Sequence, residues 1–91
     1  MNDKYICIEF KADFMDYGNV RNLLDDLDTN SDYVQAFLVT IYNDVHPHFF
    51  LSIRKENLDF ILMEINLITS AKVKEIEYPE DFTNYIKSKN I

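Results

Sequence analysis

The segment HFFLSIRKENLDFILMEINLI, residues His48–Ile68, contains the two most apolar elements of the chain. In its first part Phe49, Leu51 and Ile53 occupy alternate positions, which is the two-residue period of a β-strand. After Asn57 the apolar residues recur every three or four positions, as on one face of a helix: Leu58, Ile61, Leu62 and Ile65. We therefore predict a strand that runs directly into a helix, with Asn57 as N-cap, and the rest of the chain has to cover both.

Upstream of this segment the sequence predicts a strand, a helix and a second strand. Tyr5–Lys11 alternates between apolar and other residues, as a strand does. Asp13 is in position to cap the helix that follows. The apolar stripe of that helix consists of Val20, Leu23, Leu24 and Leu27. Tyr33–Tyr42 is the longest strand candidate, and Pro47 marks a boundary after it because proline cannot donate to a sheet ladder.

Downstream, Ala71–Tyr78 is predicted to be a fourth strand. Val73 and Ile76 cannot share one face of a regular strand, so a bulge or a late start is expected. A short helix begins at Pro79, and its apolar stripe of Phe82, Tyr85 and Ile86 predicts that it docks on the domain.

The predicted order of elements is β-α-β-β-α-β-α. Its first six elements match the ferredoxin-like, or split β-α-β, fold of the α+β class. That topology implies a four-stranded antiparallel sheet in the order 4-1-3-2 with two helices on one face, to which this chain adds a C-terminal helix. Ninety-one residues suit a single domain, 1–91. Tyr5–Lys11 and His48–Arg54 would be central strands, and Tyr33–Tyr42 would lie at an edge.

Composition favours a folded protein of the cytoplasm. Hydrophobic residues make up 47% of the chain, which favours a packed domain over a disordered one. The sequence has no apolar run of about 18 residues, the length of a membrane-spanning helix. It begins without the basic and apolar regions of a signal peptide, and a lone Cys7 cannot form an intrachain disulfide. We therefore expect a cytoplasmic protein that does not bind membranes.

Negative charge is concentrated in the first half of the chain. Residues 1–45 contain nine acids against three Lys or Arg, and residues 46–91 contain seven against six. The net charge of −7 opposes direct binding of nucleic acid, which needs clustered Lys and Arg, and favours a basic protein partner. Acidity that serves solubility alone is the alternative.

Two short patterns suggest metal ligands. Residues Asp28–Asp32 match the first positions of a calcium-binding EF-hand loop, but the sixth position is Tyr33 instead of Gly and the twelfth is Val39 instead of Glu. His46 and His48 offer two imidazoles, with Asp44 as the only nearby third ligand. A polar loop and a turn explain these patterns better, so we expect no metal and no other cofactor.

Signs of catalysis and of RNA binding are also weak. Cys7 lies inside a predicted strand, where a free cysteine is usually a packing residue, and a single glycine excludes Gly-rich phosphate loops. Tyr5 and Phe50 could imitate the aromatics of RNA-binding sheets, but the segment around Phe50 lacks their basic, glycine-bearing pattern. We therefore predict that the protein is not an enzyme.

The predicted edge strand is apolar on both faces. Phe37, Val39 and Ile41 would lie on one face, whereas Val34, Ala36 and Leu38 would lie on the other. Such an edge is prone to pair with another chain unless something covers it. The cover could be the C-terminal helix, a second copy of the chain, or a different protein.

These features lead to two hypotheses about function. The first is a non-catalytic immunity or inhibitor protein that neutralises a basic toxin or nuclease-like enzyme. Its charge-complementary residues would be Asp25, Asp26, Asp28, Asp32 and Asp44. Its aromatic anchors would be Phe37, Tyr42 and Phe50. The second is a homodimeric ligand-sensing regulatory domain, in which the exposed sheet face forms the dimer.

Overall fold

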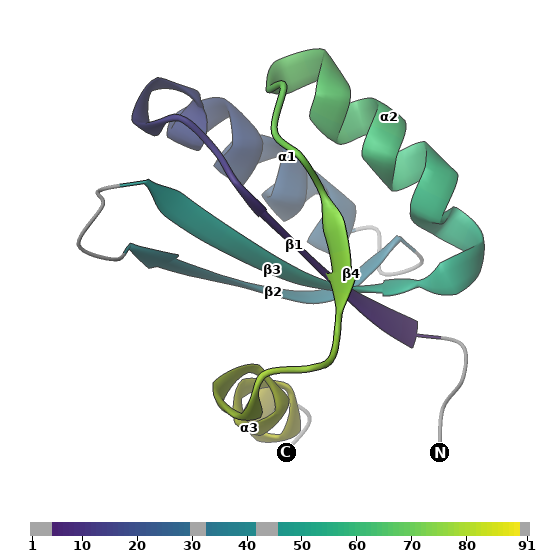
Figure 1. Ribbon diagram of the computed structural model, residues 1–91. Coiled ribbons are helices and arrows are strands. Elements are labelled where there is room, and N and C mark those ends of the chain that lie inside the picture. Colours follow the sequence, from purple (N-terminus) through teal and green to yellow (C-terminus); the bar gives the residue numbers. More distant parts are fainter. Residues whose placement is uncertain (1–4, 30–32, 42–45, 90–91) are drawn as a thin grey trace.

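The computed structural model describes residues 5–29, 33–41 and 46–89 and confirms the predicted order of elements (Figure 1). The strands are β1 (Tyr5–Lys11), β2 (Val34–Ile41), β3 (Pro47–Arg54) and β4 (Lys74–Ile76). The helices are α1 (Tyr17–Thr29), α2 (Leu58–Ile68) and α3 (Glu80–Lys89). The sheet is antiparallel, with the order β2-β3-β1-β4. The fold is thus a ferredoxin-like split β-α-β domain with an added C-terminal helix.

The sheet lies between two helical layers. Helices α1 and α2 cover one face, and α3 crosses the other (Figure 1). None of the helices among the described residues is long and apolar enough to cross a membrane.

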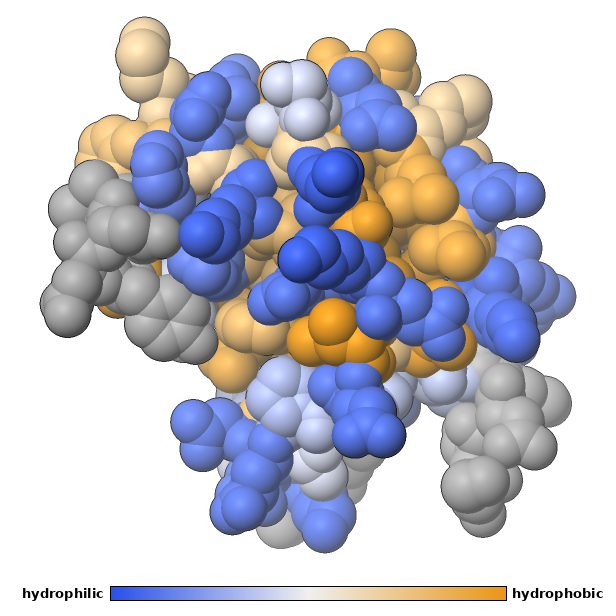
Figure 2. Space-filling view, viewed as in Figure 1, coloured by the Kyte–Doolittle hydropathy of each residue, from blue (hydrophilic) through white to orange (hydrophobic). Residues whose placement is uncertain are grey.

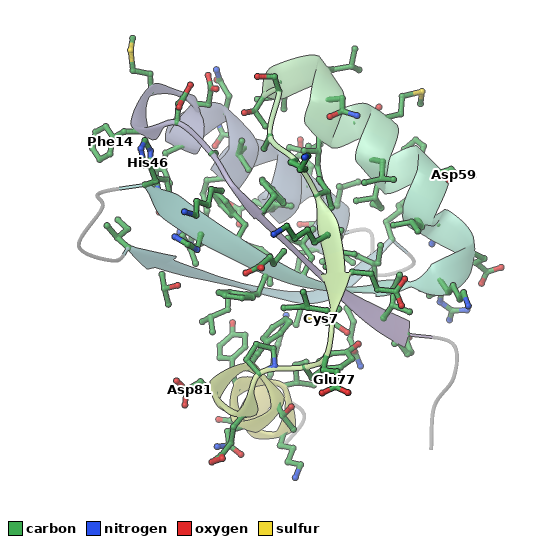
Figure 3. All side chains as sticks on the ribbon, in the orientation of Figure 1. Cys7, Phe14, His46, Asp59, Glu77 and Asp81 are labelled. Carbon is green, nitrogen blue, oxygen red and sulfur yellow. The ribbon has the colours of Figure 1, made fainter. Side chains whose placement is uncertain are left out.

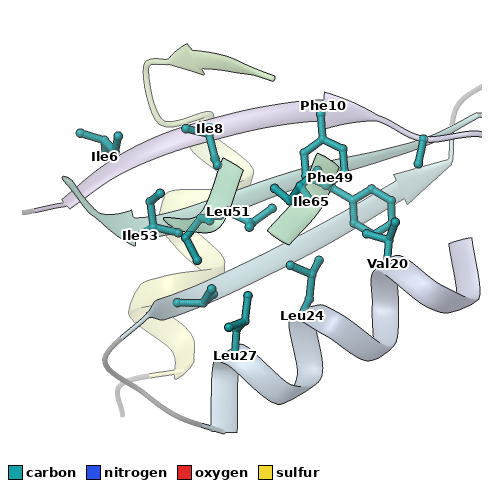
Figure 4. Packing of buried hydrophobic residues seen from close by; sticks show 13 residues of the cluster. Ile6, Ile8, Phe10, Val20, Leu24, Leu27, Phe49, Leu51, Ile53 and Ile65 are labelled. Atoms are coloured by element: carbon teal, nitrogen blue, oxygen red, sulfur yellow. The ribbon is translucent and has the colours of Figure 1, made fainter. Parts of the chain in front are cut away.

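The main core fills the space between the sheet and the pair α1 and α2 (Figure 4). It contains the alternating residues of the two central strands: Ile6, Ile8, Phe10, Phe49, Leu51 and Ile53. The helices contribute Val20, Leu24, Leu27, Ile61 and Ile65. The rings of Phe10 and Phe49 stack at 5.0 Å between centroids. The periods read from the sequence therefore identify most of the side chains that form this core, whereas Leu62, which was predicted on the same stripe, is only half-buried.

A second, smaller core lies between the opposite sheet face and α3. Its buried members are Cys7, Ala36, Phe50 and Phe82. The Phe82 ring is 6.5 Å from that of Phe50 and 6.0 Å from that of Tyr78, measured between centroids. The C-terminal helix is thus the element that covers the apolar sheet face.

The sequence predicts side-chain N-caps for α1 and α2, but neither helix has one. The side chain of Asp13 makes no capping hydrogen bond, and neither does that of Asn57. Each helix is instead preceded by one 3-10 turn, Phe14–Asp16 or Lys55–Asn57, whose first carbonyl accepts a backbone N–H of the incoming helix. The backbone thus satisfies part of the need that a capping side chain would meet.

Two irregularities in the sheet agree with the sequence pattern. β4 begins late, at Lys74, so that Val73 lies outside the strand. The pairing of β2 with β3 shifts register between Val34 and Ala36, which places a bulge at the beginning of β2.

Candidate functional site

The two edges of the sheet differ in how they resist pairing with another chain. β4 is three residues long, and its Lys74 and Glu75 are exposed. β2 is eight residues long, and its sequence VQAFLVTI contains no charged residue and no proline. Short length and charge are common protections of an edge strand. β4 has both, whereas β2 has only the bulge at its beginning.

One hydrogen bond determines which backbone groups of β2 face outward. The carbonyl of Pro47 in β3 accepts the N–H of Ala12 at 3.1 Å, so Pro47 points toward β1. Along an antiparallel strand, successive residues direct their N–H and C=O groups to alternate neighbours. His48 therefore points toward β2, where its register partner is Thr40.

The same alternation assigns the rest of the strand. Thr40, Leu38 and Ala36 direct their backbone groups toward β3, and the residues between them direct theirs away from the sheet. The outward residues after the bulge are Phe37, Val39 and Ile41. Within the described part of the chain, no hydrogen bond outside the helices and the sheet uses the backbone of these three residues.

A groove of about 220 Å³ runs along this edge, lined by Arg21, Phe37, Leu38, Val39 and Tyr85. Arg21 belongs to α1, and its guanidinium lies 5.4 Å from the centroid of the Phe37 ring. Its Nη1 donates to the Tyr17 hydroxyl at 3.0 Å, and its Nε lies 3.8 Å from Asp25 Oδ1. Tyr85 belongs to α3 and is 40% exposed. The groove therefore has one wall from each helical layer, with β2 between them.

The beginning of β2 is closed by contacts within the chain, and its end is open. Lys89 Nζ lies 3.2 Å from Asp28 Oδ1 and donates to the Gln35 carbonyl at 3.5 Å. These contacts join α3 to the end of α1 across the strand. At the other end, Ile41 is 59% exposed. The accessible part of the edge is thus Phe37–Ile41.

The predicted acidic residues separate into two groups. Asp25 and Asp26 are exposed on α1, where Asp25 lies 3.8 Å from Arg21, whereas Asp28 is half-buried and pairs with Lys89 of α3. Asp32 and Asp44 lie outside the described residues. The exposed acids of α1 are on the helix that forms one wall of the groove.

The predicted aromatic anchors do not form one surface. Phe37 packs on the α1 side of the sheet, whereas Phe50 is 8% exposed and lies against α3 on the other side. Tyr42 lies outside the described residues. Sequence reasoning missed Arg21 and Tyr85, because only the packing of α1 and α3 brings these distant residues beside β2.

A second pocket, of about 270 Å³, lies toward the opposite edge of the sheet, where β4 pairs with β1. Its lining is mostly basic and consists of Glu9, Phe10, Lys11, His48, Lys72 and Lys74. The pairing of Glu9 with Lys74 and of Lys11 with His48 places these residues on neighbouring strands. Figure 2 shows that hydrophilic residues interrupt the apolar surface on the viewed side of the molecule. The chemistry of this pocket suits a small anion.

Metal ligands do not converge in the described residues. No group of three or more His, Cys, Asp or Glu side chains there is placed to hold a metal ion. His46 lies far from Cys7 (Figure 3), and Asp44 lies outside the described residues.

Polar groups in the smaller core are paired with one another. The Ser52 hydroxyl lies 2.6 Å from Gln35 Oε1 and 2.7 Å from the Tyr78 hydroxyl. Beside them, burial and then the charge of Glu9 raise the pKa of the Cys7 thiol from 9.0 to about 12. Burial also raises the pKa of Tyr78. A thiol with such a pKa is protonated at neutral pH and is a poor nucleophile.

The raised pKa of Cys7 predicts a specific loss of stability in alkali. Below pH 9 the thiol is protonated in both states, and above it only the unfolded chain releases the proton until the pH approaches about 12. The free energy of unfolding should therefore fall as the pH rises, by about 1 kcal/mol between pH 8 and pH 10. Denaturant titrations of the wild type and Cys7→Ala measure this difference, because the variant keeps every other titrating group. Parallel pH profiles would contradict the assignment.

Together, the fold and the groove define the class of this protein: a small acidic α+β domain of ferredoxin-like topology with one open sheet edge. No protein-family model, no curated protein and no solved structure matches the chain.

Proposed function

We propose that this chain is a non-catalytic, cytoplasmic binding protein of the immunity or inhibitor type. It would neutralise a basic toxin or nuclease-like enzyme by covering the active surface of that partner. The observation that carries the proposal is the open edge Phe37–Ile41 of β2, which lies beside the acidic helix α1. A long apolar edge that the chain leaves unprotected is the kind of surface that another protein covers.

Charge supports a basic partner. α1 contains Asp25, Asp26 and Asp28 against a single Arg21, a net charge of −2 on this helix. Asp25 and Asp26 lie near its C-terminus, where the helix dipole disfavours anions. Their placement therefore gives the isolated domain little stability, but it would attract and orient a positively charged surface.

Reversal of the exposed acids tests this proposal. The partner is first captured from the source cell, identified by mass spectrometry and purified. We expect Asp25→Lys/Asp26→Lys to weaken its binding about 10–100-fold, mainly through a slower association rate and a smaller salt dependence. Asp28 is left unchanged because its ion pair with Lys89 joins α1 to α3, whereas the ion pair of Asp25 with Arg21 lies within α1.

The matched control is Glu75→Lys/Glu77→Lys. It changes the net charge equally, on exposed residues at the opposite side of the sheet. Binding kinetics measured by surface plasmon resonance compare the two variants. Equal affinities for the wild type and the α1 variant would remove the charge argument. A captured partner whose own activity is unchanged in the complex would contradict neutralisation.

The basic pocket favours a second candidate function, a ligand-sensing domain; the sheet face through which the sequence predicted it to dimerise is covered by α3, so a homodimer would have to use another surface. Lys11, Lys72 and Lys74 surround a space large enough for a small anionic metabolite. Analytical ultracentrifugation with mass spectrometry of the native protein separates the two functions. A tight homodimer that retains an anionic metabolite supports the sensing domain, and a monomer without one supports the binding protein.

A further inference from the structure

We infer that the partner binds by adding a β-strand of its own to β2, which extends the sheet to five strands. This inference rests on the proposed function and specifies how its binding site works. The pairing groups are the outward N–H and C=O groups of Phe37, Val39 and Ile41. The occupant is an extended, Lys- or Arg-bearing segment of another protein.

Hydrogen bonding is the first argument. The three outward residues present a regular series of donors and acceptors at every second position of the strand. Backbone groups of this kind remain bonded to water unless a second strand pairs with them. An added strand bonds to backbone alone, so β-augmentation needs no particular side-chain sequence in β2.

The shape of the edge is the second argument. Arg21 flanks β2 from the α1 side, and Tyr85 flanks it from the α3 side. A strand placed in the plane of the sheet would direct its alternate side chains to these two walls. The stacked Arg21 and Phe37 offer a flat platform on one side, and the half-exposed ring of Tyr85 offers an apolar contact on the other. The groove thus suits an extended strand better than a helix.

Charge decides between a second copy and a different protein. In a symmetric antiparallel pair of β2 strands, the two-fold axis is perpendicular to the sheet, so both α1 helices lie on the same face. Two helices of net charge −2 would then lie side by side, in two chains that each have net charge −7. Like charges placed opposite each other oppose this arrangement. A basic segment would instead meet a helix of net charge −2, on which the one cation, Arg21, already lies 3.8 Å from Asp25.

Val39→Pro tests the pairing directly. Proline at this position removes an outward N–H and no bond to β3, and edge strands tolerate proline there. We expect the variant to keep its circular dichroism spectrum and to lose at least about tenfold in affinity for the captured partner, which corresponds to about 1.4 kcal/mol. Val39→Ala is the control, because it trims the side chain and keeps the N–H. Unchanged affinity of a folded Val39→Pro protein would overturn strand addition and leave the proposed function standing.

A synthetic peptide gives a second test that needs neither the natural partner nor a folded variant. The probe is a ten-residue Thr-Val repeat with Lys at both ends and N-methyl groups on every second residue, so that only one of its edges can pair. With saturating peptide, NMR should show amide exchange at least about tenfold slower at Phe37, Val39 and Ile41. The amides of Leu38 and Thr40, which already face β3, should change little.

Two control peptides complete the design. The same peptide N-methylated at every residue should give no protection, and a version with Glu at both ends should bind at least about tenfold more weakly. Absence of the alternating protection with the Lys peptide would overturn the inference. Protection of the same three amides in the protein alone, together with a dimer in sedimentation, would assign the edge to a second copy and also overturn it.

Discussion

Replacement of Phe82 by alanine should detach α3 and lower the free energy of unfolding by about 3–5 kcal/mol. Phe82 is 0% exposed and is the only fully buried side chain of α3. Its ring lies 6.5 Å from that of Phe50 and 6.0 Å from that of Tyr78, measured between centroids, so its removal takes contacts from both. For a domain whose total stability is about 5–15 kcal/mol, this loss is a large fraction.

The consequence should be visible at the sheet. Without α3, the buried surface of Cys7, Ala36 and Phe50 becomes exposed to water, so the variant should bind a hydrophobic dye and self-associate. Urea titration gives the change in stability, and sedimentation gives the association. Tyr85→Ala is the matched control on the same helix, with an expected loss of less than about 1 kcal/mol because its ring is half-exposed. Similar losses for both variants would show that Phe82 does not anchor α3.

Phe49→Ala is expected to destabilise the main core by a similar amount, about 3–5 kcal/mol. Phe49 is fully buried at the centre of the sheet, stacked on Phe10 at 5.0 Å and 6.0 Å from the ring of Tyr17. It thus links β3, β1 and the beginning of α1. A cavity here lies between the sheet and the helices, so the whole domain should unfold at a lower denaturant concentration.

Phe49→Ala removes a ring from the main core and Phe82→Ala removes one from the smaller core. Comparison of the stabilities of the two variants therefore separates the contributions of the two cores. Because the chain has no tryptophan, the unfolding of Phe49→Ala is followed by tyrosine fluorescence and by far-ultraviolet circular dichroism. Both signals should report one common unfolding transition. Phe14→Ala is the control, since Phe14 is 66% exposed and its removal should change stability by less than about 0.5 kcal/mol. A loss below about 1 kcal/mol for Phe49→Ala would contradict the central role of this ring.

The candidate site was only partly predictable from the sequence. The two-sided apolar pattern of Tyr33–Tyr42 identified the edge strand, and the cluster after Leu24 identified the acidic part of α1. The sequence did not indicate that Phe37 and Phe50 lie on opposite sides of the sheet. It also gave no sign that Arg21 and Tyr85 flank β2, because their proximity depends on how two separate helices pack.

The sequence by itself determined the order of elements and the inward faces of both central strands, because a buried face imposes a period of two on a strand and of 3.6 on a helix. It also determined the sheet order, since the ferredoxin-like connections leave β2 and β4 at the edges. Only the tertiary structure decided where α3 docks. Its stripe around Phe82 needs an apolar surface, and the sheet face around Phe50 was the one that α1 and α2 leave uncovered. That docking covers the face of β2 that contains Ala36 and Leu38, whereas Phe37 and Val39 pack on the main core, and the part that remains open is the edge Phe37–Ile41.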